Sequence, residues 1–187
     1  MPIRNMILAG LFAALIAISS QVSITLPPNP VPHTLQVLFV LLAGVVLGGR
    51  WGFTSVLVWV LLGAFGLPVF TQGKAGAAVL LGPTGGFLVG FIVCAFLVGW
   101  LTERASAGFG KTLAIMLLGL AVAYAVGMAG FMASFTFFLH KPMTWGQAVA
   151  YTVVPFLPFD LVKTLAAAYL GVRLRRALAR AGYIIER

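Results

Sequence analysis

Charged side chains are scarce in this sequence. Only 8% of its 187 residues are Asp, Glu, Lys or Arg, whereas 61% are hydrophobic and the mean hydropathy is +1.10. A soluble domain carries about 25% charged residues. The composition therefore excludes an ordinary soluble domain and indicates an integral membrane protein. Because the apolar runs are long and several, they favour an all-α protein over a barrel of alternating strands.

Several kinds of chemistry are also missing. The single cysteine, Cys94, excludes an internal disulfide bond. No phosphate-binding loop with its lysine is present, so any ATP must be used by another protein. His33 and His140 have no carboxylate or cysteine near them in the sequence, and we expect no metal site. No Ser/His/Asp set is visible either, so the sequence predicts no cofactor and disfavours an enzyme.

The apolar runs predict a bundle of six transmembrane helices within one domain, residues 1–187. Residues 1–20 also have the basic start and apolar core of a signal peptide. We favour a retained first helix, because an even number of spans fits the charge distribution described next. The helices are expected at residues 6–24, 35–49, 52–68, 80–101, 112–138 and 146–172.

Basic residues give the chain a net charge of +9, and they are split among the ends of the apolar segments. That scatter makes nucleic acid a poor partner and favours an effect on topology. Two lysines, Lys74 and Lys141, fall on one side of the predicted bundle. The other side holds Arg4, Arg50, Arg104, Lys111, Arg173, Arg175, Arg176, Arg180 and Arg187. The sequence therefore predicts a multi-pass protein of the inner or plasma membrane. The positive-inside rule puts both of its termini in the cytoplasm.

Asp160 is the most informative of the three acidic residues. Glu103 and Glu186 lie next to basic residues in a predicted loop and tail, but Asp160 lies inside an apolar segment, with Lys163 on the same helical face. Asp160 precedes Arg173 by 13 residues, which puts it about 20 Å from the inner boundary at 1.5 Å per residue. A carboxylate at that depth is typical of a ligand or ion site in the outer half of the membrane.

Three interpretations of Asp160 and Lys163 remain open. They form an ion pair that helps both residues insert, or they bind a ligand that has N–H donors and a negative charge, or they act as acid and base in an intramembrane enzyme. No nucleophile or second acid lies near them, which disfavours the enzyme. Pro158 is expected to end an outer half-helix and free backbone groups to line a cavity.

Two further segments supply candidate ligand contacts. In the run GPTGGF, residues 82–87, the glycines let backbone approach a ligand or another helix closely. Thr34 and Gln36 precede the second expected helix, where they line a site or cap the helix. The candidate set from these segments is Gly82, Thr84, Gly85, Gly86, Phe87, Thr34 and Gln36.

Small residues at four-residue spacing mark the first expected helix: Ala9, Ala13 and Ala17. Such a stripe lets another helix come close. The neighbouring helix belongs either to the same bundle or to a partner membrane protein, and the sequence leaves both alternatives open.

Three blocks of the chain resemble the BioY family, the biotin-binding S components of energy-coupling factor (ECF) vitamin transporters. They are PVPHTLQVLFVLLAGVVLGGRWG, GLPVFTQGKAGAAVLLGPTGGFLVGF and PFLPFDLVKTLAAAYLG. The resemblance implies a six-helix bundle that captures biotin from outside the bacterial or archaeal cell. It also implies a transmembrane coupling protein and cytosolic ATP-hydrolysing subunits as partners.

The resemblance further implies roles for single residues. The membrane-embedded acid and lysine of the family fall on Asp160 and Lys163, its glycine block on Gly82 to Phe87, and its docking stripe on the first-helix alanines. Gln72 and Lys74 depart from the commoner glycine-rich form of the outer loop. An S component of the same architecture for another vitamin is the alternative function.

Overall fold

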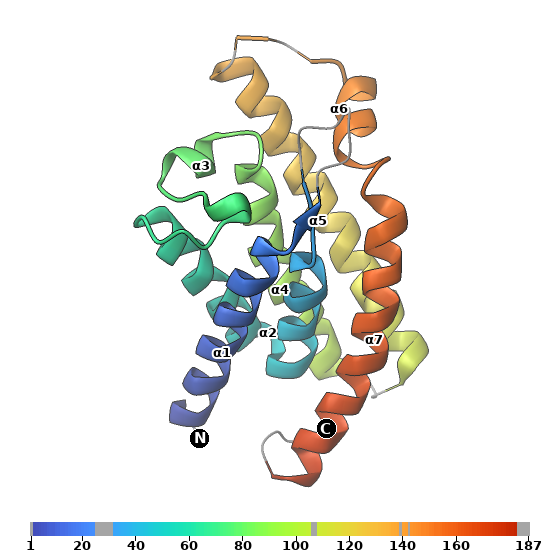
Figure 1. Cartoon of the computed structure of the whole chain (residues 1–187). Coiled ribbons are helices and arrows are strands. Elements are labelled where there is room, and N and C mark those ends of the chain that lie inside the picture. The colour runs from blue at the N-terminus through green and yellow to red at the C-terminus, as the bar shows by residue number, and fades with distance from the viewer. Residues whose placement is uncertain (1, 25–31, 106–107, 139, 142, 183–187) are drawn as a thin grey trace.

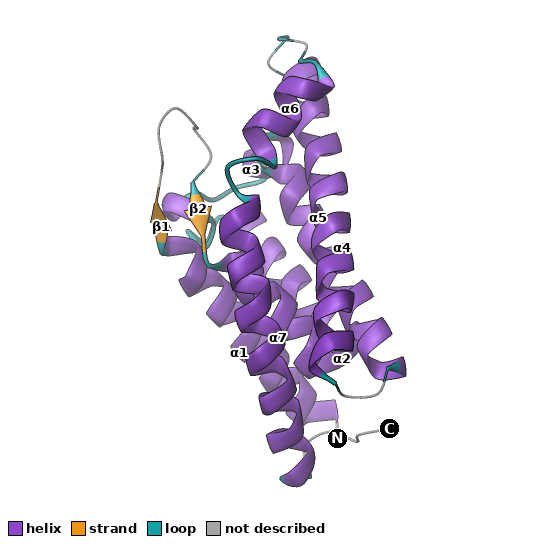
Figure 2. Cartoon of the chain, turned by 90° about the vertical axis from the view of Figure 1, so that its right-hand side faces the viewer, coloured by secondary structure: helices purple, strands orange, loops and turns teal. Residues whose placement is uncertain are grey.

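The computed structural model describes residues 2–24, 32–105, 108–138, 140–141 and 143–182 (Figure 1). Seven α-helices carry most of these residues. In chain order the elements are α1 (Pro2–Gln21), β1 (Ser23–Ile24), β2 (His33–Thr34), α2 (Gln36–Ala64), the 3₁₀ helix η1 (Thr71–Gly73), α3 (Ala78–Leu81), α4 (Gly85–Arg104), α5 (Phe109–Phe137), α6 (Trp145–Thr152) and α7 (Leu157–Arg180). The two short strands pair antiparallel beside the upper end of α1 (Figure 2).

Helix α2 is a tight helical hairpin that folds back at Gly48. This residue has φ 82° and ψ 176°, a conformation outside the helical region that glycine alone adopts readily. A Cβ on Gly52 would lie 3.0 Å from the Cα of Gly44, whereas eight residues of straight helix span about 12 Å. At the turn, the Gly49 N–H donates to Oε1 of Glu103 at 3.1 Å. The two halves match the separate helices expected at residues 35–49 and 52–68.

The described residues contain six membrane segments, as the sequence predicts. Four helices are long and apolar enough to span a membrane: α1, α2, α4 and α5. Helices α6 and α7 pass the same test together, and they add a fifth span if the pair, bent by 52° at a short break, is counted as one. Because α2 reverses at Gly48, it contributes two segments rather than one. The protein is therefore an all-α, multi-pass membrane protein.

Helix boundaries differ from the expected ones where glycine and proline occur. The helix expected at residues 80–101 begins only at Gly85, after α3 and a turn. The helix expected at 146–172 is interrupted at residues 153–156 and continues to Arg180. Pro158 does not end the outer half-helix. It lies in the first turn of α7, where the N–H that proline lacks would have no partner within the helix.

The core lies around α2, which packs against α1, α4 and α7, while α5 packs against α4 and α7. Its largest fully buried side chains include Trp59, Leu41 and Met116. Glycines allow close contact between helices. A Cβ on Gly86 of α4 would lie 2.6 Å from the Cα of Gly130 on α5.

The alanine stripe of α1 packs inside the bundle. Ala9 and Ala13 are buried, at 4% and 3% exposure, and Ser55 of α2 donates to the Ala9 carbonyl at 2.9 Å. Ala17 is half-buried. Two of the three alanines thus contact other helices of the bundle, and the docking role that the family resemblance implies stays a prediction. Small side chains are needed here to bring α1 close to α2.

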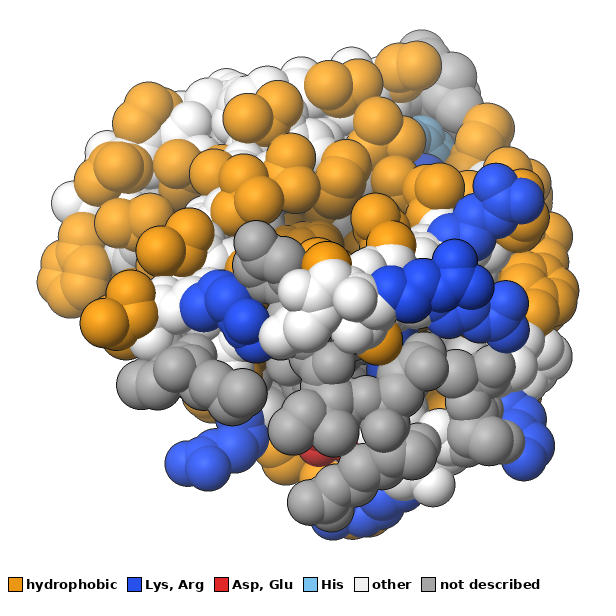
Figure 3. Space-filling model, turned by 90° about the horizontal axis from the view of Figure 1, so that it is seen from below, with side chains coloured by type: hydrophobic (Ala, Val, Ile, Leu, Met, Phe, Trp, Pro, Cys, Tyr) orange, Lys and Arg blue, Asp and Glu red, His pale blue; other side chains and the backbone are white. Residues whose placement is uncertain are grey.

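Lys and Arg side chains surround the end of the molecule at which both termini lie (Figures 1 and 3). Arg4 and Arg180 belong to the terminal helices, while Arg50 and Arg104 lie at helix turns of the same end. Two of these residues also tie helices together. The Arg175 guanidinium donates to the Thr102 carbonyl at 3.0 Å, and Arg4 donates to the Gly182 carbonyl at 3.0 Å. The opposite end of the bundle carries the candidate site.

Candidate ligand-binding site

A cavity lies in the bundle at the end opposite the termini, between β2, η1 and helices α2, α4, α5 and α7. The space open to the centre of a water molecule is about 100 Å³. The described residues that line it are Pro32, Thr34, Gln36, Val37, Phe70, Thr71, Lys74, Val79, Thr84, Phe87, Leu88, Phe91, Leu120, Ala123, Tyr124, Thr152, Phe156, Asp160 and Lys163. Most of these are apolar, with a few polar groups converging on the same space, as is typical of a small-molecule site.

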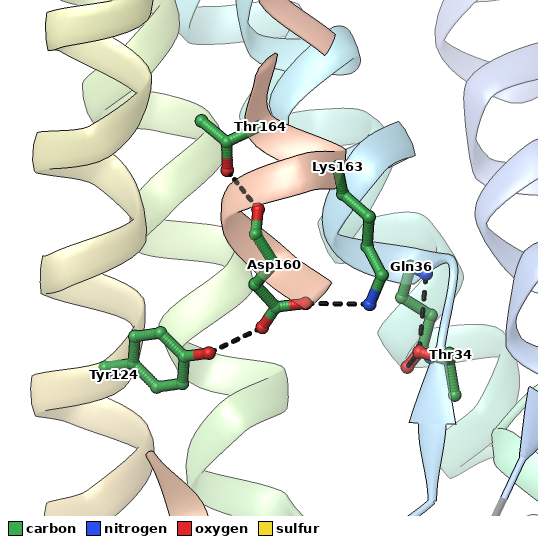
Figure 4. Close-up of polar contacts among 6 residues, drawn as sticks. All are labelled: Thr34, Gln36, Tyr124, Asp160, Lys163 and Thr164. Atoms are coloured by element: carbon green, nitrogen blue, oxygen red, sulfur yellow. Dashed lines mark hydrogen bonds and ion pairs between the residues drawn. The ribbon is translucent and has the colours of Figure 1, made fainter. Parts of the chain in front are cut away.

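Asp160 is the centre of the polar groups (Figure 4). Its carboxylate accepts from the Lys163 ammonium at 2.7 Å through Oδ1 and from the Tyr124 hydroxyl at 2.6 Å through Oδ2. Asp160 is 4% exposed, so these two partners, rather than solvent, stabilise its negative charge. Distances this short are typical of hydrogen bonds to an ionised group.

Local structure explains how a carboxylate is accommodated there. Asp160 lies in the first turn of α7, directly after the break at residues 153–156. Free N–H groups and the helix dipole stabilise negative charge at that position. The i,i+3 spacing brings Lys163 to the same face, and Thr164 donates to the Asp160 carbonyl at 2.6 Å. The break in the last span therefore positions the acid that the sequence singles out.

The Asp160 carboxylate has acceptor capacity left for a ligand. An ionised carboxylate offers about four lone-pair positions, and Lys163 and Tyr124 occupy two of them. Two N–H groups of a bound molecule would satisfy the remainder. The site thus fits a ligand with paired N–H donors on a compact polar head.

A second polar cluster lies on the opposite wall. Thr34 donates to Oε1 of Gln36 at 2.8 Å, and the Gln36 N–H donates back to the Thr34 hydroxyl at 3.3 Å. Thr71 of the outer loop approaches the same Gln36 oxygen at 3.5 Å. In the view of Figure 4 the Lys163 ammonium lies between Asp160 and this cluster. Polar groups on two walls enclose the apolar middle of the cavity.

Aromatic side chains form much of that apolar middle. Phe87 packs so closely on α5 that a Cβ on Gly127 would lie 2.3 Å from its ring. Phe70 is 2% exposed and meets the Trp59 ring edge-on at 5.6 Å between centroids. Both rings are fixed by packing, and they offer flat apolar walls without ordering additional side chains on binding.

The candidate residues from the sequence divide into two groups. Thr34, Gln36, Thr84, Phe87, Asp160 and Lys163 all line the cavity. Gly82, Gly85 and Gly86 are not among the lining residues, and their ligand contacts stay a prediction. A Cβ on Gly85 would collide with the Leu80 carbonyl, and one on Gly86 would collide with α5. Gly85 lets the α3–α4 turn close and Gly86 lets α4 approach α5, while Phe87 lines the cavity.

Tyr124 and Lys74 are the main cavity residues that the sequence analysis did not assign. Tyr124 stands in the apolar helix α5, where a phenol needs a hydrogen-bond partner, and that requirement was an available signal. Its pairing with Asp160 depends on how α5 packs on α7, which periodicity does not show. Lys74 departs from the commoner glycine-rich form of the family's outer loop, and the fold brings it to the cavity.

His33 covers the break between α6 and α7. It is 8% exposed and stacks on Phe156 at 4.3 Å and on Phe159 at 5.0 Å between ring centroids. Neither ring nitrogen has a hydrogen-bond partner among the described residues. Burial, and then the nearby Lys163 ammonium, lower the pKa of His33, while Asp160 raises it to a lesser extent. A neutral imidazole therefore acts here as an aromatic packing group.

This geometry defines a class of protein: a small α-helical membrane protein with a cavity suited to a polar-headed, largely apolar ligand. The BioY family model matches residues 1–180, and the chain belongs to the BioY family.

Relatives and a solved structure agree with this assignment. The chain is 45% identical over 173 residues to a biotin transporter BioY of Thermotoga maritima, covering 92% of this chain and 96% of that one. It is 38% identical to a probable biotin transporter BioY of Pyrococcus horikoshii, with 94% and 98% coverage. The fold matches a crystal structure of the S-component for biotin from an ECF-type ABC transporter with a TM-score of 0.82, at 29% identity, covering 94% of this chain and 92% of that chain.

Proposed function

We propose that this protein captures biotin and is the substrate-binding subunit of an ECF-type vitamin transporter. The observation that carries the proposal is the cavity in which Asp160, Tyr124 and Lys163 converge inside apolar walls. Biotin has a ureido head with two N–H groups, an apolar sulfur-containing ring and a carboxylate tail. Paired N–H donors suit the two acceptor positions left on Asp160, and the fused rings suit the aromatic walls.

Names of the relatives support the ligand and the transport role. All of those described above are transporters or transporter components, and their names specify biotin. They favour transport over catalysis by Asp160 and Lys163. A capture subunit for a different vitamin is the competing function, and it predicts a cavity whose polar groups match another head group.

Calorimetric titration of the purified protein in detergent tests the proposal, with biotin as ligand and riboflavin and thiamine as controls. Saturable one-site binding of biotin alone is expected. A folded sample that binds riboflavin or thiamine instead of biotin would identify another vitamin. Release of a chemically altered ligand would instead support the alternative of an intramembrane enzyme.

We further propose that residues 1–187 form a single transmembrane domain in a bacterial or archaeal cell membrane, with both termini in the cytoplasm. The Lys and Arg side chains around the end with the termini support this orientation (Figure 3). Because Cys94 is buried, it should not react with a membrane-impermeant maleimide, and the reagent should label only introduced cysteines. Neither Gly146→Cys nor Gly110→Cys would place a Cβ within 4 Å of another atom, so the fold should tolerate both. The outer Gly146→Cys should react in intact cells, and the cytoplasmic Gly110→Cys should react only after permeabilisation. The reverse pattern would invert the topology.

A transmembrane coupling protein and cytosolic ATP-hydrolysing subunits are the proposed partners. Co-purification of the tagged chain with these subunits from the native cell tests the assembly. Biotin uptake that persists after the ATPase genes are deleted would show that the chain works without them.

A further inference from the structure

Lys74 is a second cation at the cavity, beside the paired Lys163. The chain has only three acidic residues, so few carboxylates exist to compensate it. Asp160 is bound to Lys163, Glu103 accepts from Gly49 at the opposite end of the bundle, and Glu186 lies outside the described residues. The only ion pair among the described residues is that of Lys163 with Asp160. Lys74 is exposed and has no carboxylate partner among them.

From this arrangement we infer that Lys74 binds the carboxylate of the ligand, and that the ureido head therefore lies at Asp160 and Tyr124. The inference rests on the proposed capture of biotin and assigns the two ends of the molecule within that site. Two lysines and one aspartate among the described lining residues leave the cavity with a net charge of plus one. A ligand with a single negative charge neutralises it.

Repulsion by Asp160 explains why Lys163 is the poorer partner for the ligand carboxylate. The Lys163 ammonium is already held at 2.7 Å by Asp160, and its side chain is only 13% exposed. A second carboxylate at that point would meet Asp160 at close range, and like charges in one site repel. Lys74 offers an ammonium group without that repulsion.

The loop that carries Lys74 is held in place by α1 and α2. Gln21 of α1 donates to the Phe70 carbonyl at 3.0 Å and accepts from the Gly73 N–H at 3.0 Å. Phe70 is buried against Trp59, and its N–H donates to the Lys74 carbonyl at 3.1 Å. The Lys74 backbone is therefore positioned before any ligand binds, which reduces the entropy lost on binding.

Affinities for biotin and for biotinamide, its neutral carboxamide, test the inference by calorimetry in detergent. The wild-type protein should bind biotin at least about tenfold more tightly than biotinamide, which is the lower limit expected for a hydrogen bond to a charged group. In Lys74→Gln the preference should fall to about one, with biotinamide affinity unchanged, which also reports that the variant is folded. Lys141→Gln removes the other lysine of the same end, which does not line the cavity, and should keep the wild-type preference.

Two results would overturn the assignment. A preference for biotin that survives in Lys74→Gln, or that disappears in Lys163→Gln instead, would move the carboxylate away from Lys74 while leaving biotin capture intact. If the wild-type protein bound neither compound, the proposed function itself would fail, and the role of Lys74 with it.

Discussion

Replacing Asp160 with Asn removes the charge at the centre of the site while keeping its size. The carboxylate accepts from Lys163 at 2.7 Å and from Tyr124 at 2.6 Å, and we propose that its two remaining lone-pair positions accept from the ureido head. A hydrogen bond to a charged group contributes about 1.5–3 kcal/mol. Asp160→Asn should therefore raise the Kd for biotin by about 10- to 150-fold.

Asp160→Asn should affect the stability of the fold less than it affects the affinity for biotin. Breaking a fully buried ion pair costs about 3–5 kcal/mol. The Lys163 side chain keeps 13% exposure and faces the cavity, so water can solvate its ammonium once the partner is neutral. We expect a thermal unfolding midpoint in detergent that drops by a few degrees while the variant remains monodisperse.

Glu103→Gln is the matched control for this experiment. It makes the same chemical change in the carboxylate at the Gly49 turn, at the other end of the bundle, and should leave the Kd for biotin unchanged. A folded Asp160→Asn protein with a Kd within twofold of wild type would refute the role of Asp160 in binding.

Three further variants test the surroundings of the site. Tyr124→Phe removes the 2.6 Å hydrogen bond to Asp160, and titration should show biotin binding about fivefold weaker, as expected for about 1 kcal/mol; unchanged affinity would make the hydroxyl a structural group only. Gly86→Ala would put a Cβ 2.6 Å from Gly130 and should destabilise the protein by about 1–3 kcal/mol, whereas Gly10→Ala, with no atom within 4 Å, should not lower the unfolding midpoint. His33→Phe keeps the aromatic stack and removes two ring nitrogens without partners, so its midpoint should rise. Because the folded state lowers the His33 pKa from 6.5, the wild type should be fully stable above pH 6.5 and lose stability below it, a loss that the Phe variant should lack.

Local patterns in the sequence account for the helices and for part of the site. Long apolar runs predict six membrane segments because unpaired backbone is so unfavourable in hydrocarbon that each span must form its own hydrogen bonds. The same reasoning identifies Asp160, since a lone carboxylate in such a run needs a functional or structural partner. The i,i+3 pairing with Lys163 is also local, and the structure contains it at 2.7 Å.

Contacts between segments far apart in the chain were decided only by the tertiary structure. Tyr124 reaches Asp160 because α5 packs on α7, and Lys74 faces the cavity because Gln21 and Trp59 hold its loop. The glycines of residues 82–87 and the alanines of α1 have the same small side chains whether they face a ligand, a partner or a neighbouring helix. Sequence alone thus determined which segments span the membrane and which charge lies within it, because both follow from local hydrophobicity and helix periodicity. Which surfaces of those helices meet depends on side-chain packing across the whole bundle, and only the folded chain brings the groups of the site together.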